Sequence, residues 1–212
     1  MTLKLGVVMD PIAVINIKKD TTFAMLLAAQ ARGMSIHYLE PTDIWLQDGA
    51  TWGRMRTLRV TDDPTHWFDL GEAVVQPLAE LDALLMRKEP PFNMEYIYMT
   101  YLLQHVQEQG VLLVNNPQSI RDANEKLLTS WFPQCCPATL VTSKSELIKQ
   151  FAQQQGKIVL KPLDGMGGQS IFYAAAQDVN LNVIIDTLTE NQTRLVMAQQ
   201  FIPAIRQGDK RL

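Results

Sequence analysis

Short apolar runs alternate with longer amphipathic segments along the chain, a pattern typical of buried strands that alternate with helices. The run Leu3–Met9 is almost wholly apolar, as expected for a strand of a parallel sheet covered on both faces. Thr21 or Thr22 can cap a helix that ends at Gly33, and Ser35–Leu39 follows as a second strand. This order predicts a β-α-β unit with a right-handed crossover.

Strands and helices continue to alternate up to Phe132. The Asp48-Gly49 pair predicts a tight hairpin that joins Ile44–Gln47 to a strand around Arg54–Val60. The further predicted elements are a strand over Asp82–Met86, a helix over Asn93–Gln109, a strand over Val111–Val114 and a helix over Pro117–Phe132. This alternation is typical of an α/β architecture.

A second pattern begins after Pro133–Pro137, which interrupts any helix twice. Its predicted elements are a strand over Thr139–Thr142, a helix opened by a capping box at Ser143–Glu146 and ending near Gln155, strands over Ile158–Lys161 and Ser170–Tyr173, a helix over Asn180–Glu190 and a strand over Arg194–Phe201. Gly208-Asp209 then predicts a turn. Because a strand is due after it, we expect further residues beyond Leu212.

Composition narrows the class of protein. Of 212 residues, 47% are hydrophobic and 19% are charged, which is typical of a folded globular chain. A net charge of −3 argues against a nucleic-acid partner, and no run approaches the roughly 18 apolar residues of a membrane span. Cys135 and Cys136 are adjacent and close no loop, so we expect reduced thiols and a cytoplasmic protein.

The glycine-rich turn after Lys161 carries most of the chemical information. Gly165, Gly167 and Gly168 lie within four residues, so backbone N–H groups can approach a phosphate without a Cβ in the way. The lysine precedes the glycines and a strand follows them, which argues against both a Walker A loop and a Rossmann turn. The pattern predicts a strand–loop–strand flap over a nucleotide. An ordinary tight hairpin with an exposed lysine is the alternative.

Two other charged positions fit a nucleotide site. Lys126 lies on the predicted helix and is either a second cation or a solvated helix lysine. In Asp209-Lys210-Arg211, the aspartate can accept ribose hydroxyls and the basic pair can hold a phosphate or a carboxylate. A surface charge cluster is the alternative for that segment.

In order and spacing, several segments resemble the ATP-grasp superfamily, and within it the bacterial glutathione synthetases, over the whole chain. The segments that carry the resemblance are Val8–Ile12, Asn16–Asp20, Leu85–Phe92, Asn116–Lys126, Leu160–Gly168, Met197–Pro203 and Gly208–Arg211. The resemblance implies an α/β fold, with an N-terminal parallel-sheet (pre-ATP-grasp) domain before an incomplete ATP-grasp fold. The implied parts are a substrate-binding domain (1–122), a connecting helix and linker (123–137), a central ATP-grasp subdomain with the flap (138–203) and the start of a C-terminal subdomain (204–212).

The resemblance also implies a reaction. Family members join γ-glutamylcysteine to glycine through an acyl phosphate, with ATP converted to ADP and phosphate. Mg²⁺ bridges the phosphates, and its ligands are expected beyond Leu212, so none is named here. We therefore expect the 212 residues alone to be inactive. A homotetramer with no membrane or nucleic-acid partner is implied as well.

Other readings stay open at this point. One is a related carboxylate–amine ligase, such as D-alanine–D-alanine ligase or a glutamate-adding enzyme. Another is a naturally short nucleotide-binding module without catalysis, and a third is an α/β structural domain without a ligand.

Site residues follow from the resemblance position by position. Lys126 and Lys161 contact the phosphates and the adenine side of ATP, and the three glycines form the flap. The remaining implied roles are adenine recognition by Gln199 and the backbone of Phe201 and Ile202, ribose binding by Asp209, stabilisation of the transferred phosphate by the catalytic Arg211, and peptide binding by Asn16 and Arg87. For Arg87, a core-rim arginine beside Glu89 is the alternative.

Overall fold

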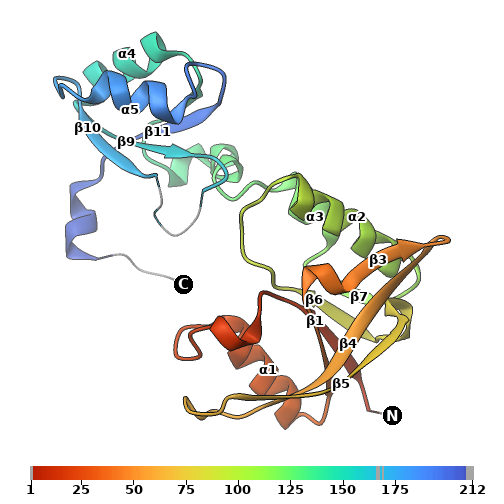
Figure 1. Ribbon diagram of the computed structural model, residues 1–212. Helices are drawn as coiled ribbons and strands as arrows, with labels where there is room; N and C mark the ends of the chain where they lie inside the picture. Colours follow the sequence, from red (N-terminus) through yellow and green to blue (C-terminus); the bar gives the residue numbers. More distant parts are fainter. Residues whose placement is uncertain (1, 166–167, 169, 209–212) are drawn as a thin grey trace. The chain divides into compact units, whose positions relative to one another are not determined.

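The computed structural model describes residues 2–165, 168 and 170–208 of the chain. These residues divide into two compact units, Met1–Asp122 and Ala123–Leu212, each with its own sheet (Figure 1). The expected four-part division is finer than this and stays a prediction. Among the described residues, no helix is both long and apolar enough to span a membrane.

The first unit contains a seven-stranded sheet among the described residues, with strand order β3-β4-β2-β1-β6-β7 and β5 paired to β4. Its elements are β1 (Lys4–Val8), η1 (Ile12–Val14), α1 (Thr21–Ala31), β2 (Ser35–Leu39), η2 (Pro41–Asp43), β3 (Ile44–Gln47), β4 (Ala50–Val60), β5 (Phe68–Pro77), η3 (Leu78–Glu80), β6 (Ala83–Met86), α2 (Met94–Glu108), β7 (Leu112–Val114) and α3 (Pro117–Asp122). The strands β2, β1, β6 and β7 are parallel, whereas β3, β4 and β5 pair antiparallel. The sheet is therefore mixed rather than parallel throughout.

Both faces of this first sheet are covered. Neighbouring strand residues point to opposite faces, so Val7 packs with Phe23 and Leu26 of α1, whereas Val8 packs with Leu103 of α2. All five side chains are almost fully buried. Such burial on both sides explains why the central strands are nearly continuous apolar runs in the sequence.

Two details of this unit differ from the sequence-based expectation. Asp20, not Thr21 or Thr22, caps α1, and its carboxylate accepts a hydrogen bond from the Phe23 N–H at 2.6 Å. The strand β5 was not predicted, because its exposed, glycine-containing sequence lacks an apolar run and its order comes from pairing with β4. The predicted hairpin at Asp48-Gly49 is confirmed, with both residues at positive φ.

The second unit is built on a four-stranded antiparallel sheet, in the order β10-β9-β11-β8. Its elements are η4 (Leu127–Trp131), η5 (Pro133–Cys135), β8 (Thr139–Thr142), α4 (Ser145–Gln155), β9 (Lys157–Pro162), β10 (Phe172–Ala175), α5 (Leu181–Leu188), β11 (Val196–Gln200) and η6 (Pro203–Gln207). The expected strand–loop–strand arrangement around the glycines is confirmed as the antiparallel pair β9–β10.

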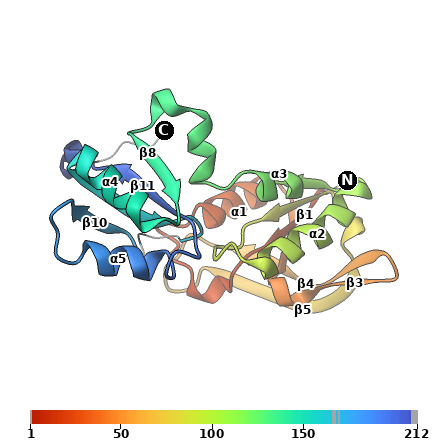
Figure 2. The same cartoon turned by 90° about the horizontal axis from the view of Figure 1, so that it is seen from above.

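Helices cover one face of this second sheet. Both α4 and α5 lie along the same side (Figure 2), and their residues Ile148 and Ile185 pack with Ile158, Leu160 and other buried residues of the strands. The alternate residues of the strands therefore point to the opposite face, which carries Lys161, Gln199 and Thr139 together with apolar residues such as Val159 and Met197.

The structure contradicts the predicted continuous helix over Pro117–Phe132. The α-helix α3 ends at Asp122, and short 3-10 turns follow. The side chain of Asn124 accepts hydrogen bonds from the N–H groups of Lys126 and Leu127, which replaces helical bonding with a local turn. The capping box at Ser143–Glu146 is also wrong, since α4 begins at Ser145 after Lys144 without a side-chain cap.

Candidate functional site

The face of the second sheet opposite α4 and α5 carries a chain of polar contacts across three strands. Lys161 of β9 donates from Nζ to Oε1 of Gln199 at 2.6 Å, and Gln199 of β11 donates from Nε2 to Oγ1 of Thr139 at 2.9 Å. Gln199 lies opposite Thr139 in the strand register, which explains why a β8 side chain meets it. These contacts fix the carboxamide with its oxygen toward the lysine.

A second lysine lies close to the first. Lys126 donates from Nζ to the carbonyl oxygen of Gly165 in the glycine-rich loop and to Oε1 of Glu125 at 2.9 Å. Burial, and next the positive charge of Lys126, lower the pKa of Lys161 from its ordinary value. The sequence predicted two cations for one site, and the structure brings them together. Lys126 lies at the N-cap of the 3-10 helix η4 and not on the predicted α-helix.

Charge is incompletely balanced in this cluster. Glu125 pairs with Lys126 but is exposed, with 66% of its side chain accessible against 13% for the lysine. Among the residues that the structure describes, Lys161 forms no ion pair with a carboxylate. A half-buried lysine whose ammonium is held by an amide oxygen favours an anionic ligand, because an anion offsets both the desolvation and the repulsion from Lys126.

The loop between β9 and β10 lies beside the two lysines. Gly165 is in contact with Lys126, and Gly168 has φ +78°, a conformation that favours glycine. Gly167 lies outside the described residues, as do Asp209 and Arg211, so their expected roles stay predictions.

An apolar surface lies near the other end of β9. The Tyr173 ring meets the Phe201 ring edge-on, with centroids 4.7 Å apart, and the Phe201 N–H donates to the carbonyl of Lys157. That N–H is therefore already bonded within the sheet. The expected contact with the adenine edge is left to the other backbone groups around Phe201 and Ile202.

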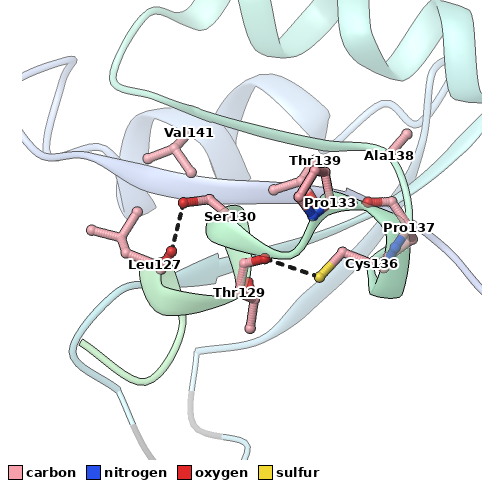
Figure 3. A pocket seen from close by; sticks show the side chains of 9 residues that line it. All are labelled: Leu127, Thr129, Ser130, Pro133, Cys136, Pro137, Ala138, Thr139 and Val141. Carbon is pink, nitrogen blue, oxygen red and sulfur yellow. Dashed lines mark hydrogen bonds between the residues drawn. The ribbon is translucent and has the colours of Figure 1, made fainter. Parts of the chain in front are cut away.

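A pocket of about 530 Å³ lies between β8 and the segment that precedes it (Figure 3). Its lining is mostly apolar, with three hydroxyls and one thiol: Leu127, Thr129, Ser130, Pro133, Cys136, Pro137, Ala138, Thr139 and Val141. The Ser130 hydroxyl and the Cys136 thiol donate to main-chain carbonyls of Leu127 and Thr129. Volume and lining fall within the range of small-molecule sites. Thr139 both lines the pocket and bonds Gln199 of the polar chain.

The two residues expected to bind peptide lie in the first unit, after neighbouring parallel strands. Asn16 lies between β1 and α1, where its side chain accepts from the Lys18 N–H. Arg87 follows β6 and donates from Nε to the Thr22 hydroxyl at 2.9 Å. Loops beyond the carboxyl ends of parallel strands are the usual ligand-binding edge of an open α/β sheet.

Neighbouring groups at this edge are also polar. The Asp10 carboxylate accepts from the Glu89 N–H at 2.8 Å, and the Tyr96 hydroxyl donates to the Lys88 carbonyl at 3.3 Å. Burial, followed by the charge of Glu89, raises the pKa of Tyr96. Glu89 thus bonds Asp10 through its backbone N–H. Among the described residues Arg87 and Glu89 form no ion pair, so the alternative interpretation of Arg87 as a partner of Glu89 gains no support.

Family comparisons agree with this geometry. Residues 3–121 match the description "Prokaryotic glutathione synthetase, N-terminal domain", and residues 125–212 match "Prokaryotic glutathione synthetase, ATP-grasp domain". The chain belongs to the prokaryotic glutathione synthetase family. The expected resemblance and the expected ATP-grasp fold are thus confirmed.

Curated relatives of this family are similar throughout the chain. The glutathione synthetase of Coxiella burnetii is 56% identical over 212 residues, which is all of this chain and 66% of the relative. That of Shewanella oneidensis is 57% identical over 210 residues, or 99% of this chain and 67% of the relative. The chain thus spans about two thirds of the length of these relatives.

Solved structures support the fold alone. A D-cycloserine synthetase gives a TM-score of 0.60 at 14% identity, covering 95% of this chain and 60% of its own. A RimK domain ATP-grasp protein from Sphaerobacter thermophilus gives 0.59 at 18% identity, covering 94% and 64%. At such identities these structures show a shared fold alone, and function rests on the family and on the site.

Sequence reasoning missed four residues that shape the site: Asn124, Cys136, Thr139 and Arg194. Thr139 had a usable signal, because residues two apart in a strand point to the same face. Thr139 and Val141 therefore share a face of β8, and both line the pocket. Asn124 also had one, since asparagine competes with helical bonding. Arg194 is 30 residues from its partner Asp164, and no local pattern relates them.

Proposed function

We propose that this chain is the larger part of an ATP-dependent ligase that joins γ-glutamylcysteine to glycine through an acyl phosphate, giving glutathione, ADP and phosphate. The observation that carries the proposal is the cluster of Lys161, Lys126 and Gly165. It lies on the face of the second sheet opposite α4 and α5, called here the open face. Membership of the glutathione synthetase family supports this ligase over the related carboxylate–amine ligases.

The lysines supply what the phosphates of ATP require. A carboxylate that attacks a phosphate brings two anions together, and fixed cations stabilise the charge where it develops. Lys161 is held in place by Gln199 before a nucleotide arrives, so little reorganisation is needed. Lys126 exchanges the Gly165 carbonyl for a phosphate oxygen, and Gly165, Gly167 and Gly168 present backbone N–H groups from the flap.

The pocket beside Thr139 takes the nucleobase in this proposal. Its volume of about 530 Å³ and its apolar walls suit a planar ring system, and the hydroxyls give polar contacts at its rim. Gln199 meets the base from the lysine side. Asp209 holds the ribose and Arg211 lies near the transferred phosphate.

Magnesium fits the phosphates but has no proposed ligand within this chain. Groups of three or more His, Cys, Asp or Glu side chains that could hold a metal are not found among the described residues. Mg²⁺ supplies charge neutralisation between phosphate oxygens when it is bound with ATP. The residues that hold it are placed beyond Leu212 in this proposal.

The peptide substrate binds at the strand ends of the first unit. Arg87 pairs with a carboxylate of γ-glutamylcysteine, since its guanidinium offers a planar fork beside the bond to Thr22. Asn16 contributes polar contacts from the loop after β1. A homotetramer in the cytoplasm is part of the proposal and rests on the family resemblance.

A coupled assay tests this function on the full-length protein. ADP release must require both γ-glutamylcysteine and glycine, and glutathione must form in equal amount. ADP release with D-alanine alone would support a different ligase of this superfamily. ATP binding without turnover for any acid and amine pair would support a non-catalytic nucleotide-binding module.

A further inference from the structure

Three consecutive residues at the start of the glycine-rich loop are each held by a different side chain. Asn124 donates from Nδ2 to the Leu163 carbonyl at 3.2 Å, Arg194 bonds the Asp164 carboxylate, and Lys126 bonds the Gly165 carbonyl. The strand β9 ends at Pro162, so these contacts begin where the sheet stops supporting the chain.

The contact between Arg194 and Asp164 is the ion pair among the three, and both carboxylate oxygens take part in it. Nη2 of Arg194 lies 2.6 and 2.7 Å from the two carboxylate oxygens of Asp164, and Nη1 lies 2.9 Å from Oε1 of Glu190. One guanidinium thus joins the loop to the turn between α5 and β11. Because its two nitrogens bond two different carboxylates, the guanidinium is held between the loop and the turn by charge-assisted hydrogen bonds.

The turn that presents Arg194 is itself well anchored. Glu190, Asn191 and Gln192 have positive φ values of 48°, 55° and 69°, and the turn is closed by bonds to the fully buried Thr189. The Gln192 N–H donates to the Thr189 hydroxyl, and the Arg194 N–H donates to the Thr189 carbonyl. Arg194 therefore reaches the loop from a fixed base.

The role of this ion pair follows from what nucleotide binding does to the other anchors. A Lys126 ammonium that turns to a phosphate gives up the Gly165 carbonyl. Asn124 and Arg194 then hold the strand-side leg of the loop. Asn124 holds a main-chain oxygen through one bond, whereas Arg194 meets both oxygens of a carboxylate.

We propose that Arg194 is a positioning residue for nucleotide binding, which acts through Asp164 to hold Leu163–Gly165, the first residues of the glycine-rich loop, in place beside the lysine cluster. This inference rests on the proposed function and extends it to a residue outside the lysine cluster. Both side chains are partly exposed, at 38% and 47%, so the pair contributes little to global stability. Its loss changes ATP binding instead.

Four variants of the full-length protein test the proposal: Arg194→Gln, Arg194→Lys, Asp164→Asn and Glu190→Gln. We expect Arg194→Gln and Asp164→Asn each to raise the Kd and KM for ATP roughly fivefold with little change in kcat, as for a coupled pair of contacting side chains. Arg194→Lys keeps the charge and loses the guanidinium that reaches Asp164 and Glu190 together, so its KM should lie between those of wild type and Arg194→Gln.

The controls separate positioning from a general structural effect. Glu190→Gln breaks only the other arm of Arg194, so ATP affinity should stay at the wild-type value. The double variant Asp164→Asn/Arg194→Gln should be no weaker than either single variant, because one contact is removed in all three. Melting temperatures should agree among all variants.

Several outcomes would overturn the inference. Wild-type ATP affinity in both Arg194→Gln and Asp164→Asn would do so, as would equal losses in Glu190→Gln and Arg194→Gln or fully additive losses in the double variant. Wild-type protein that binds no ATP would remove the proposed function together with this inference. Normal ATP binding with unaffected variants would remove this inference alone.

Discussion

The two sheets of this chain place their candidate binding sites in two different ways on an α/β scaffold. In the first unit, apolar side chains cover both faces of the sheet, and the polar residues gather at the carboxyl ends of its parallel strands. In the second unit, apolar residues cover one face and the polar chain from Lys161 through Gln199 to Thr139 crosses the other. A sheet covered on both faces leaves only its ends for a ligand, whereas a sheet covered on one face offers a surface.

The largest expected effect compares the two faces within one strand. Leu160→Ala should lower the free energy of unfolding by about 2–5 kcal/mol, because Leu160 is fully buried under α4 and α5. Val159→Ala, on the open face of β9, should cost less than about 1 kcal/mol. Urea unfolding measures both. Equal losses would mean that the open face is packed as a core.

Lys161→Met tests the charge of the open face. Removing the ammonium should weaken ATP binding about 100-fold, since an attraction of roughly 4 kcal/mol at close range is lost before desolvation is counted. Lys157→Met is the matched control, because Lys157 is an exposed lysine of the same strand and should leave ATP affinity unchanged. Calorimetric titration measures both Kd values. Unchanged affinity in Lys161→Met would remove this lysine from the site.

Arg87→Met tests the strand-end site of the first unit. The KM for γ-glutamylcysteine should rise about tenfold, as expected when a charge-assisted hydrogen bond to a carboxylate is lost. The KM for ATP should stay unchanged. Arg59→Met on β4 is the control, since Arg59 is exposed and its side chain forms no ion pair among the described residues. Steady-state kinetics with each substrate varied would reveal a shared effect, which would contradict two separate sites.

Cys136 reports on the pocket beside the open face. In a Cys135→Ser background, ATP at ten times its Kd should slow alkylation of Cys136 about tenfold, because a filled pocket covers the thiol. In a Cys136→Ser background, the exposed Cys135 should react at the same rate with and without ATP. Mass spectrometry follows both reactions. Unprotected Cys136 would place the nucleotide elsewhere.

The smallest expected effect is the pH dependence of stability that Lys161 contributes on the open face of the second sheet. Burial, and next Lys126, lower the pKa of Lys161 in the folded chain, so the unfolded chain binds more protons between that lowered pKa and the ordinary value of 10.5. Stability without ligand should therefore rise slightly with pH across this window. ATP affinity should fall across the same window, as the ammonium is lost.

Lys161→Met is the control for this pH dependence. In that variant the rise of stability with pH should be smaller, and urea midpoints at several pH values measure it. An identical pH dependence in both proteins would assign the effect to another group.

The sequence by itself determined the alternating elements and the position of the flap. Apolar runs such as Leu3–Met9 and turn pairs such as Asp48-Gly49 act locally, because the strand periodicity and positive φ values they require are properties of a few consecutive residues. The lysine before three glycines identified the loop for the same reason. The chemistry of this part of the site could therefore be predicted from residue types and their order.

Only the tertiary structure decided which side chains meet. The strand β5 forms by pairing with β4, and the predicted helix beyond Asp122 yields to the turn made by Asn124. The bonds from Lys161 to Gln199 and from Arg194 to Asp164 join residues 38 and 30 positions apart. Such contacts depend on strand register and on the packing of separate elements, which no local pattern of residues records.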